Sequence, residues 1–416
     1  MVENTGIYYM PPMKKGWRLT RIGYVCDKVT KSFREDSVAL ICSNKGKVVE
    51  RPDDVTGKMV SEDHAMQGIS KGDIAIHGMD TWHGAIAYSD LDGKITRVVH
   101  VCDSSEENRF IVYYLQLLAH LGVYKLISNG VRGNTSDFRS WDKVKDIRIS
   151  LPSFEEQRAI ADYLDKKTAD IDAAIKEAQE LIEKYKEYKR SKVKEIFDYY
   201  LSKESYVKAK LGSLASLVTK QTGFDYSNTI SPSLVGELTE NTLPYIQTRH
   251  FKDNYWNYET EYYIPKNVAR LFPQIILDKR CLLFSIVGAS IGNVAVYPGE
   301  VKAFLGGAIC KVDLFDEDNY DYIKHYMMSC DGQEQISFNI KASAQGTITV
   351  QNVRDFKIPI FEDKSIKEKI SSRVDDISSK IYALIKDKEN LISKLQEYRK
   401  SIIFEYVTGK KEVPNG

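Results

Sequence analysis

Cysteine is scarce in this sequence, and nothing in its placement suggests a disulfide framework or a zinc site. Six cysteines are scattered over 416 residues, and no two of them form a Cys-x-x-Cys pair. The N-terminal residues also contain no apolar stretch of the signal-peptide type. Scattered, unpaired cysteines are typical of reduced thiols in an intracellular compartment. We therefore expect a cytoplasmic protein.

Long hydrophobic runs are also absent. The longest run without a charged residue covers 281–299, and Ser285, Gly288, Gly292 and Pro298 interrupt it. A membrane-spanning helix needs roughly 20 predominantly apolar residues. The run instead predicts two buried strands joined by a glycine turn.

The sequence lacks the motifs that mark common catalytic centres. It has no Gly-x-x-x-x-Gly-Lys-[Ser/Thr] phosphate loop and no His-Glu-x-x-His zinc motif. It also has no [Asp/Asn]-Pro-Pro-[Tyr/Phe] motif, with which an amino-methyltransferase would hold a flipped base. The seven histidines are dispersed. We expect neither catalytic residues nor a metal site in this chain.

An excess of either charge is missing as well. Lysine and arginine number 59, aspartate and glutamate number 58, and the net charge is +1. Binding to nucleic acid without sequence preference is driven mainly by basic charge. The composition therefore argues against a lone, non-specific DNA-binding protein. It allows a protein whose basic groups cluster on one face, or whose partners supply many of the phosphate contacts.

What the sequence does contain is an internal repeat. Ile171–Ile175 matches Ile381–Ile385, and Tyr188 matches Tyr398, both at a spacing of 210 residues. Further matches at slightly shorter spacings occur upstream, so insertions and deletions lie within the preceding segments. The period is far longer than the 20–50 residues of solenoid repeats. It indicates duplication of a whole unit, in the order globular domain, helix, globular domain, helix.

Two segments, 155–200 and 364–407, are predicted to be long helices. Neither contains Gly or Pro, and apolar residues recur at steps of three and four. The stripe positions are 160, 164, 171, 175, 178, 182 and 185 in the first, and 366, 370, 377, 381, 384, 391, 395, 398 and 402 in the second. Helices this long need a partner stripe. We expect them to pack antiparallel on each other; a generic coiled-coil dimerisation arm is the alternative.

The two globular segments are predicted to be mixed α/β (α+β) domains rich in strand. In the first, short strands are expected at 71–76, 84–88 and 95–101, followed by a helix at 109–121. In the second, strands are expected at 281–286, 293–297 and 308–312, followed by a helix at 320–329.

A polar loop follows the helix of each globular segment, at 128–139 and at 341–349. Side chains in these loops can bond to base edges or phosphates, and glycines allow close approach of the backbone. The candidates for DNA contact in the first loop are Arg132, Asn134, Thr135, Ser136 and Arg139. Those in the second loop are Lys341, Ser343, Gln345, Thr347 and Thr349. Weaker candidates are Gln247, Arg249 and the pair Gln221–Thr222.

Several segments resemble the specificity subunits of type I restriction–modification enzymes. The segment 151–165, which contains Pro152, Glu156, Gln157 and Ile160, resembles the Pro-x-x-x-Glu-Gln-x-x-Ile start of that family's conserved helix. Segments 77–85, 345–347 and 407–410 are similar to further family patterns. The second helix departs from the pattern, because the segment 362–368 lacks Glu-Gln.

The resemblance implies a pseudo-twofold fold with two target-recognition domains separated by two antiparallel coiled-coil helices. The domains would occupy residues 1–152 and 204–361. The helices would occupy residues 153–203 and 362–416, the latter including the C-terminal tail.

The resemblance also implies a function. Each recognition domain would read one half of a bipartite, asymmetric site in double-stranded DNA, and the helices would set the gap. Two methyltransferase subunits, which bind S-adenosylmethionine, and restriction subunits, which use ATP and magnesium, would assemble on the chain. The chain itself would hold no cofactor. A coiled-coil scaffold and a stand-alone DNA-modifying enzyme are the alternatives.

Overall fold

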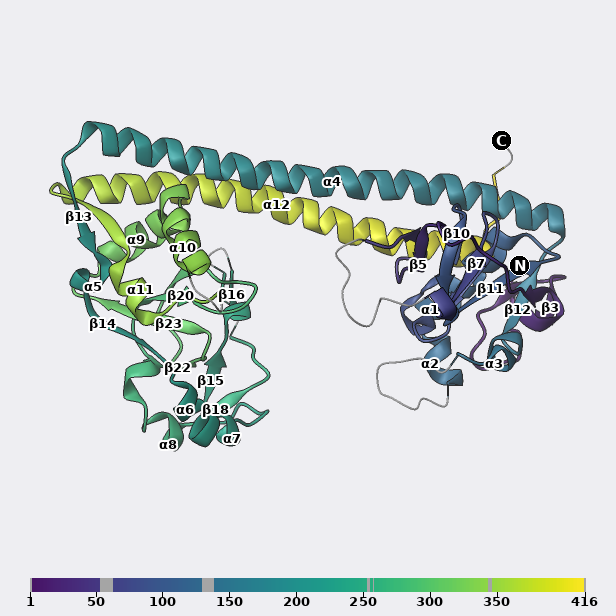
Figure 1. Cartoon of the computed structure of the whole chain (residues 1–416), viewed down its shortest axis with the longest axis horizontal. Coiled ribbons are helices and arrows are strands. Elements are labelled where there is room, and N and C mark those ends of the chain that lie inside the picture. Colours follow the sequence, from purple (N-terminus) through teal and green to yellow (C-terminus); the bar gives the residue numbers. More distant parts are fainter. Residues whose placement is uncertain are drawn as a thin grey trace. The chain divides into compact units, whose positions relative to one another are not determined.

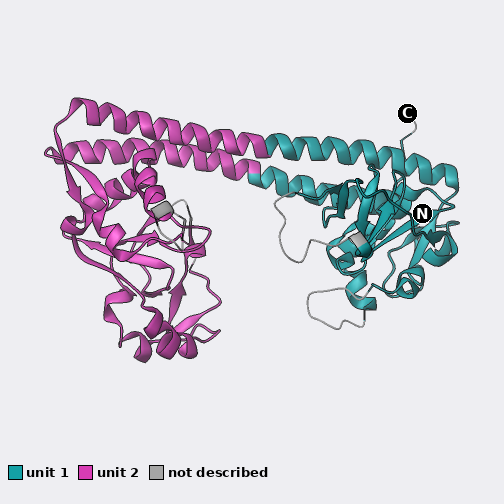
Figure 2. Cartoon of the chain, in the orientation of Figure 1, with its two compact units in different colours: residues 1–178, 389–416 teal, residues 179–388 magenta. Residues whose placement is uncertain are grey.

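The chain folds into two units, each built around part of both long helices. The computed structural model describes residues 2–52, 63–128, 138–252, 255–256, 258–342 and 346–414; at positions 63, 252, 255, 341 and 342 it describes the backbone alone. Residues 1–178 and 389–416 form unit 1, and residues 179–388 form unit 2 (Figure 2).

The two predicted helices are confirmed. Helix α4 runs over Phe154–Lys203 and helix α12 over Lys364–Val407. Within unit 1, Tyr163 stacks near Tyr406 with ring centroids 4.5 Å apart, and Asp172 lies 3.7 Å from Arg399. The order of these contacts shows that the helices run antiparallel, as Figure 1 also shows within each unit. The predicted antiparallel pairing is therefore correct.

The described globular part of unit 1 contains two four-stranded sheets and two small two-stranded ones. The first sheet has the strand order β6-β5-β10-β7, and the second has the order β4-β11-β8-β9. The first comprises β5 Ala39–Cys42, β6 Val48–Glu50, β7 Met66–Ile69 and β10 Gly93–Thr96. The second comprises β4 Cys26–Lys28, β8 Ile74–His77, β9 Ile86–Tyr88 and β11 Val99–Ser104. The pairs β3 Arg18–Arg21 with β12 Arg148–Leu151, and β1 Val2–Glu3 with β2 Met13–Lys14, are two-stranded.

The globular part of unit 2 is built in the same way. Its first sheet has the order β18-β15-β22-β19, and its second has the order β14-β23-β20-β21. The first comprises β15 Thr242–Ile246, β18 Tyr263–Pro265, β19 Ile276–Leu277 and β22 Ala303–Leu305. The second comprises β14 Ala215–Lys220, β20 Cys281–Ser285, β21 Val294–Tyr297 and β23 Ile309–Leu314. The two-stranded pairs are β13 Tyr206–Lys210 with β24 Lys357–Phe361, and β16 Phe251–Lys252 with β17 Tyr255–Trp256.

Every pairing in the four-stranded sheets of one unit has a counterpart in the other. In each first sheet one pair is parallel, β5 with β10 and β15 with β22, and the remaining pairs are antiparallel. All pairs in the second sheets are antiparallel. The repeat detected in the sequence is therefore a repeat of strand order and direction. The predicted fold class, mixed α/β domains with long paired helices, is confirmed.

Short helices complete each unit. Unit 1 contains α1 Asn108–His120, α2 Val123–Ile127, α3 Trp141–Lys145 and the 3-10 turns Ile22–Tyr24, Asp63–Ala65 and Thr81–His83. Unit 2 contains α5 Leu211–Leu214, α6 Gly223–Asp225, α7 Ser231–Ser233, α8 Lys266–Ala269, α9 Asn319–Met327, α10 Cys330–Ala342 and α11 Val350–Asp355. It also contains a π-helical turn at Tyr226–Ile230 and 3-10 turns at Thr248–His250 and Pro273–Ile275.

Helices α1 and α9 join each second sheet to a long helix. Helix α1 is buried from Phe110 to Ala119, since it packs on β8 and β9 with one side and belongs to the same core as residues of α4 with another. In unit 2, α9 packs on β20 and β21, and its residues Tyr322 and Tyr326 contact Phe197 of α4. A helix covered on both sides is apolar around most of its circumference. The globular part of each unit is thereby attached to the long helices.

One prediction about an individual strand requires correction. Residues 95–101 do not form one strand, because β10 ends at Thr96, β11 begins at Val99, and the two strands belong to different sheets. Arg97 and Val98 form the turn between them. The predicted glycine turn in the uncharged run is confirmed: β20 and β21 are joined through Gly288 and Gly292, both with positive φ. In the described part of the chain, no helix combines the length and apolar character that a membrane crossing requires.

The predicted apolar stripe of the second helix is only partly buried. Ile366, Ile370 and Ile381 are buried, as predicted. Leu384 and Leu391 are each 41% exposed, and Tyr398 is 51% exposed. These three positions therefore do not pack fully against α4, and the prediction that they do is wrong.

The buried positions Leu164 and Val374, which are 210 residues apart and 0% and 2% exposed, test the packing of the two helices. We expect Leu164→Ala to lower the free energy of unfolding by about 2–5 kcal/mol, because it leaves a cavity in a closed core. Val374→Ala removes fewer carbon atoms and should cost less. Urea unfolding followed by circular dichroism measures both effects. Leu384→Ala, at an exposed site, is the control; an equal loss there would contradict this account of the core.

Candidate nucleic-acid interface

In unit 1, three segments meet at one end of the second sheet. The backbone N–H of Gly78, just after β8, donates to the carbonyl of Val98 in the β10–β11 turn at 3.0 Å. The carbonyl of Gly78 accepts from the backbone N–H of Phe138 at 3.0 Å. Phe138 stands near the end of the polar loop that the sequence marks as a candidate for DNA contact. We call this junction of 78, 97–98 and 138–139 the recognition edge of unit 1.

Unit 2 contains the same junction. Ile286, just after β20, donates its N–H to the carbonyl of Ala308 in the β22–β23 turn at 2.9 Å. The carbonyl of Ile286 accepts from the N–H of Ile348 at 3.0 Å, at the end of the second polar loop. We call the junction of 286, 306–308 and 347–348 the recognition edge of unit 2. The two loops thus end at equivalent places, as their equivalent positions in the sequence predict.

Local sequence explains why the chain turns here. Strands β8 and β20 consist of buried, mostly apolar residues up to their last positions, so the polar and glycine-containing segments that follow leave the sheet. Gly84 and Gly292 then return the chain into β9 and β21, with φ of 80° and 90°. A side chain at either position would be strained in this left-handed conformation.

The candidates of the first loop divide into two groups. Arg132, Asn134, Thr135 and Ser136 lie outside the residues that the structure describes. Arg139 is described, and it is exposed immediately after Phe138 at the recognition edge.

A buried histidine holds the end of this loop. The imidazole Nε2 of His100 lies 2.7 Å from the carbonyl oxygen of Phe138, and the ring packs near Trp141. Burial lowers the pKa of His100, so the ring is neutral near pH 7 and its Nε2–H donates to this carbonyl. The backbone that leads to Arg139 is therefore fixed by a contact with β11.

The candidates of the second loop are placed differently. Lys341 lies in α10, which continues to Ala342, so the loop begins later than the sequence suggests. Ser343 and Gln345 lie outside the described residues. Thr347 is half-buried in the loop, next to Ile348.

Thr349 has a structural role in this arrangement. Its hydroxyl accepts from the backbone N–H of Asn352 at 3.1 Å, and the Asn352 side chain accepts from the N–H of Thr349 at 2.9 Å. This reciprocal pair is a capping box at the start of α11. Thr349 therefore fixes the end of the loop, although its side chain remains exposed.

The weaker candidates lie beside the recognition edge of unit 2. Gln247 follows Ile246, whose carbonyl accepts from the N–H of Gly306 at 2.8 Å. Gln221 is buried, and its side-chain oxygen accepts from the hydroxyl of Tyr245 at 3.0 Å. An added Cβ at Gly307 would stand 2.8 Å from that oxygen, so the close approach requires glycine. The structure thus brings Gln221 and Gln247 to the β22–β23 turn.

Arg249 is placed less favourably for binding phosphate. Its guanidinium lies 3.1 Å from a carboxylate oxygen of Glu261 and lines an open hollow of about 390 Å³ together with His250, Glu259 and Thr260. Burial lowers the pKa of His250, and the neighbouring guanidinium lowers it further. Two carboxylates and one arginine leave this hollow without a net positive charge.

Arg97 is a candidate that the sequence interpretation missed. It lies in the β10–β11 turn at the recognition edge of unit 1, and it is exposed while its Nε donates to the carbonyl of Met66 at 3.0 Å. A single strand at 95–101, as the sequence predicts, would place Arg97 inside a sheet and not in an exposed turn. Arg97 lies in a turn because the chain passes from the first sheet to the second after Thr96. No local sequence pattern indicates this change of sheet. The equivalent position in unit 2, at the 210-residue spacing, is Gly307.

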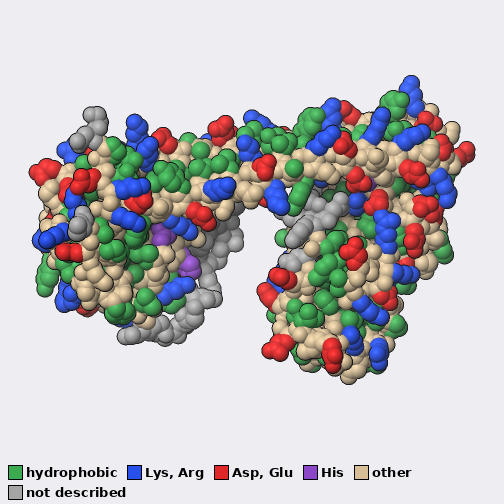
Figure 3. Space-filling view, turned by 180° about the vertical axis from the view of Figure 1, so that it is seen from behind, with side chains coloured by type: hydrophobic (Ala, Val, Ile, Leu, Met, Phe, Trp, Pro, Cys, Tyr) green, Lys and Arg blue, Asp and Glu red, His purple; other side chains and the backbone are tan. Residues whose placement is uncertain are grey.

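The surface charge agrees with the neutral composition. On the face drawn in Figure 3, lysine and arginine side chains are interspersed with aspartate and glutamate in both units, and no broad area carries one sign. Among the described residues, no group of three or more His, Cys, Asp or Glu side chains is arranged to hold a metal ion.

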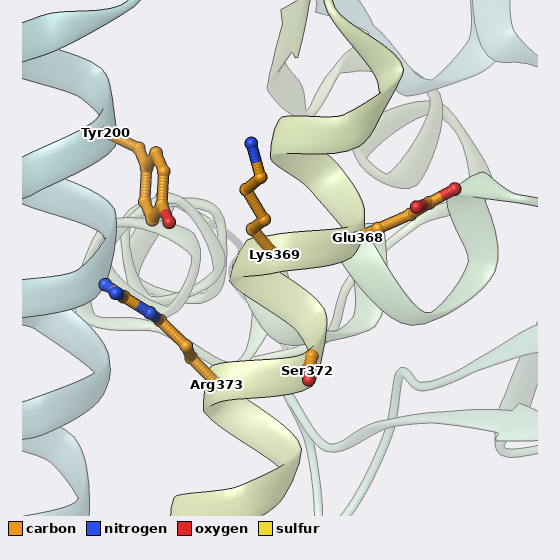
Figure 4. A pocket seen from close by; sticks show the side chains of 5 residues that line it. All are labelled: Tyr200, Glu368, Lys369, Ser372 and Arg373. Carbon is orange, nitrogen blue, oxygen red and sulfur yellow. The ribbon is translucent and has the colours of Figure 1, made fainter.

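A second hollow lies on the helices of unit 2. It has a volume of about 410 Å³ and is lined by Tyr200, Glu368, Lys369, Ser372 and Arg373. Arg373 lies over the Tyr200 ring, with the guanidinium carbon 5.8 Å from the ring centroid (Figure 4). Because it is open and lined by both charges, we assign it to helix packing.

The two repeated units of this chain also correspond to a known sequence family. The profile of the type I restriction modification DNA specificity domain matches the chain twice, at residues 15–184 and 185–394. The chain therefore belongs to the type I restriction–modification DNA specificity family, and its role is that of a DNA specificity subunit. A search of curated proteins finds no match.

Three solved structures are similar to this chain, and the first of them shows the same fold. A chain from a structure of a type I R-M system, studied for complex assembly and conformational transition, is similar with a TM-score of 0.67 and 16% identity; the match covers 96% of this chain and 99% of that one. The HsdS subunit from Thermoanaerobacter tengcongensis has a TM-score of 0.44 and 18% identity, with 96% and 98% covered. The type I S subunit from M. genitalium has a TM-score of 0.42 and 13% identity, with 96% and 98% covered.

The capping role of Thr349 can be tested by substitution. Thr349→Ala should lower the free energy of unfolding by about 1 kcal/mol, because the first N–H groups of α11 lose their side-chain acceptor. Thr349→Ser keeps the hydroxyl and should stay close to the wild type. Urea unfolding of both variants measures the difference. Equal stability of Thr349→Ala and the wild type would contradict the capping role.

Proposed function

We propose that each unit reads one half of a bipartite target in double-stranded DNA through its recognition edge. The observation that carries this proposal is the repeated junction of three segments, found at the same place in two units of identical strand order. Side chains on loops that a rigid scaffold holds can read base edges, while contacts to phosphate set the position on the duplex. Arg97, Arg139, Thr347 and Gln247 are the described residues that we assign to this interface. Arg132, Asn134, Thr135, Ser136, Lys341, Ser343, Gln345, Thr349 and Arg249 remain candidates from the sequence.

The two half-sites should differ in sequence. Arg97 of unit 1 corresponds to Gly307 of unit 2, and a guanidinium can bond to guanine whereas glycine offers the backbone alone. The scaffold is repeated, but the side chains that it presents are not. An asymmetric target follows from this difference.

The helices are proposed to set the gap between the half-sites. Helix α4 is continuous over 50 residues, which corresponds to a length of about 75 Å. Fixed spacing allows the binding of one half-site to raise the effective concentration of the other domain at the second half-site. Two modest affinities can then produce one strong and selective interaction.

The chain is proposed to act as a non-catalytic subunit. Methyl transfer would be performed by two methyltransferase subunits carrying S-adenosylmethionine, and cleavage by restriction subunits using ATP and magnesium, in the cytoplasm. The similar chain of 0.67 TM-score comes from a study of complex assembly in a type I R-M system, which supports such partners. The exposed side chains of Leu391 and Tyr398 on the part of α12 that belongs to unit 1 supply apolar surface for docking.

Arg139 provides the most direct test of the interface. If it contacts phosphate, Arg139→Ala should weaken binding to duplex DNA and reduce the slope of log affinity against log salt by about 1. The measurement is a fluorescence-anisotropy titration of the complex with its methyltransferase over a series of salt concentrations. Arg34→Ala is the matched control, because Arg34 is exposed, pairs with Asp36 and lies near the opposite end of β10. An unchanged slope for Arg139→Ala would remove this residue from the interface.

The spacing role of the helices can be tested by changing their length. Deleting seven residues from the middle of both α4 and α12 shortens each by about 10 Å and keeps the helical register. The preferred gap should then shorten by about three base pairs, at 3.4 Å for each pair. Methylome sequencing of a host that expresses the chain with its methyltransferase measures the gap. A gap that is unchanged by the deletion would contradict the spacing role.

A further inference from the structure

Each long helix carries one buried and one half-buried polar side chain near its beginning, at equivalent positions. Helix α4 carries Gln157 and Asp165, and α12 carries Lys367 and Asp375. Both pairs are separated by eight residues, and the two pairs are 210 residues apart. Gln157 and Lys367 are 0% and 5% exposed. Because burying a polar group is costly unless it is bonded, their partners show what the positions do.

In unit 1, Gln157 binds the residues that lead into α1. Its side-chain oxygen accepts from the backbone N–H of Glu107 at 3.1 Å. Its side-chain nitrogen donates to the Glu106 carboxylate at 2.7 Å and to the carbonyl of Pro152 at 3.1 Å. All three of these hydrogen bonds reach the start of α1 or the residue that follows β12.

Asp165 binds α1 at residues that lie further along α1 than the residues bound by Gln157. Its carboxylate accepts from the hydroxyl of Tyr113 at 2.7 Å and from the guanidinium of Arg109 at 2.7 Å. Arg109 also lies 2.8 Å from Asp162 and from Glu107. Helix α1 is therefore bonded to α4 at two separate points.

In unit 2, Lys367 takes the place of Gln157. Its ammonium group donates to the side-chain oxygen of Asn319, the first residue of α9. The missing Glu-Gln motif of the second helix is thus replaced by a different side chain that binds the equivalent place, the start of the domain helix.

Asp375 takes the place of Asp165. Its carboxylate lies 3.0 Å from Nε2 of His325 and 3.8 Å from the ammonium of Lys324, both on α9 and both nearly fully buried. Adjacent residues of α9 therefore face the aspartate of α12, as Arg109 and Tyr113 of α1 face the aspartate of α4.

We call Gln157 and Asp165 the anchors of unit 1, and Lys367 and Asp375 the anchors of unit 2. Apolar residues fill the space between the two anchors of each helix. They are Ile160 and Leu164 in α4 and Ile370 and Val374 in α12, all at most 2% exposed. Apolar packing stabilises the contact without specifying direction. Hydrogen bonds and ion pairs depend on distance and angle, so the anchors at either side determine how the domain helix is oriented.

We propose that Gln157 with Asp165, and Lys367 with Asp375, are positioning residues that fix the angle at which each recognition domain is carried on its own length of helix. This inference rests on the proposed function in one respect: the angle would help to set the DNA gap that the subunit accepts.

The contact between α12 and α9 in unit 2 includes a buried histidine, His325. The groups that act on His325 are Asp375 of α12 and Lys324 and Asp321 of α9. Arg280, just before β20, acts on Lys324, and Lys189 of α4 acts on Asp375. Burial lowers the pKa of His325, although Asp375 acts to raise it. The stabilisation from a histidine with a lowered pKa is complete above about pH 6.5 and is lost as the pH falls below that value. The anchor at Asp375 should therefore loosen in mild acid.

The experiment measures the distance between two spin labels within unit 2 of the full-length chain. Of the six cysteines, Cys330 alone is exposed, so Cys330→Ser leaves five buried thiols, and new cysteines replace the exposed residues Glu300 and Asp387. Asp375→Asn and Lys367→Met should each make the distance distribution about twice as wide, because the first removes the charge that faces His325 and Lys324 and the second removes the bond to Asn319. The wild type should broaden at pH 5.5, and His325→Gln should remove that pH dependence.

The control is Asp376→Asn, which changes the neighbouring exposed aspartate, paired with Lys380 at 2.7 Å. Its distribution should match that of the wild type. Distributions as narrow as the wild type in both Asp375→Asn and Lys367→Met would overturn the proposal. Two variants on separate bonds keep the test valid if one of them does not fold.

A DNA measurement separates this proposal from the proposed function. Binding is measured to DNA duplexes that contain the methylated target sequence. The gap between the half-sites is either natural or one base pair longer or shorter. Asp375→Asn should reduce the preference for the natural gap by about tenfold, equivalent to about 1.4 kcal/mol, while Asp376→Asn should preserve it. A broadened distance distribution with an unchanged preference would overturn the link between angle and gap. Absence of any gap preference in the wild type would contradict the proposed function, and the distance measurement would still decide the role of the anchors.

Discussion

The burial of one apolar stripe on each long helix is the constraint on which the rest of the structure depends. In proteins most of the stability of an amphipathic helix comes from packing of its apolar face, and α4 packs on α12 and on the domain helices α1 and α9. Because the long helices pack on each other and on the domain helices, each unit contains part of both long helices. The same packing also explains why α1 and α9, which lie between a sheet and a long helix, are buried along most of their length.

The duplicated scaffold separates stability from specificity. Strand order, strand direction and the backbone bonds at Gly78 and Ile286 are repeated in the two units, because they support the core and the turns. The exposed side chains at the same edges differ, as Arg97 and Gly307 illustrate. Surface residues of a loop can change with little effect on a core. One architecture can therefore present two different sets of base-reading groups.

The polar contacts between the long helices and the domain helices also keep their positions in the two units, while the side chains that form them differ. Gln157 and Lys367 are chemically unlike, yet each bonds to the residues at the start of a domain helix. Asp165 and Asp375 are alike, yet their partners are arginine and tyrosine in one unit and histidine and lysine in the other. The geometry of the attachment is preserved, while its chemistry is free to vary as long as each buried group is bonded.

The sequence by itself determined the repeat, both long helices, the strand-rich domains and the position of the two polar loops, because helix periodicity, glycine turns and a 210-residue spacing are local or directly comparable features. Tertiary structure alone decided that Arg97 lies at the recognition edge, that Thr349 caps α11 and that Leu384, Leu391 and Tyr398 remain exposed. It also decided that Lys367 substitutes for Gln157. These properties depend on which distant segments come together, and residue type and spacing along the chain do not encode that proximity.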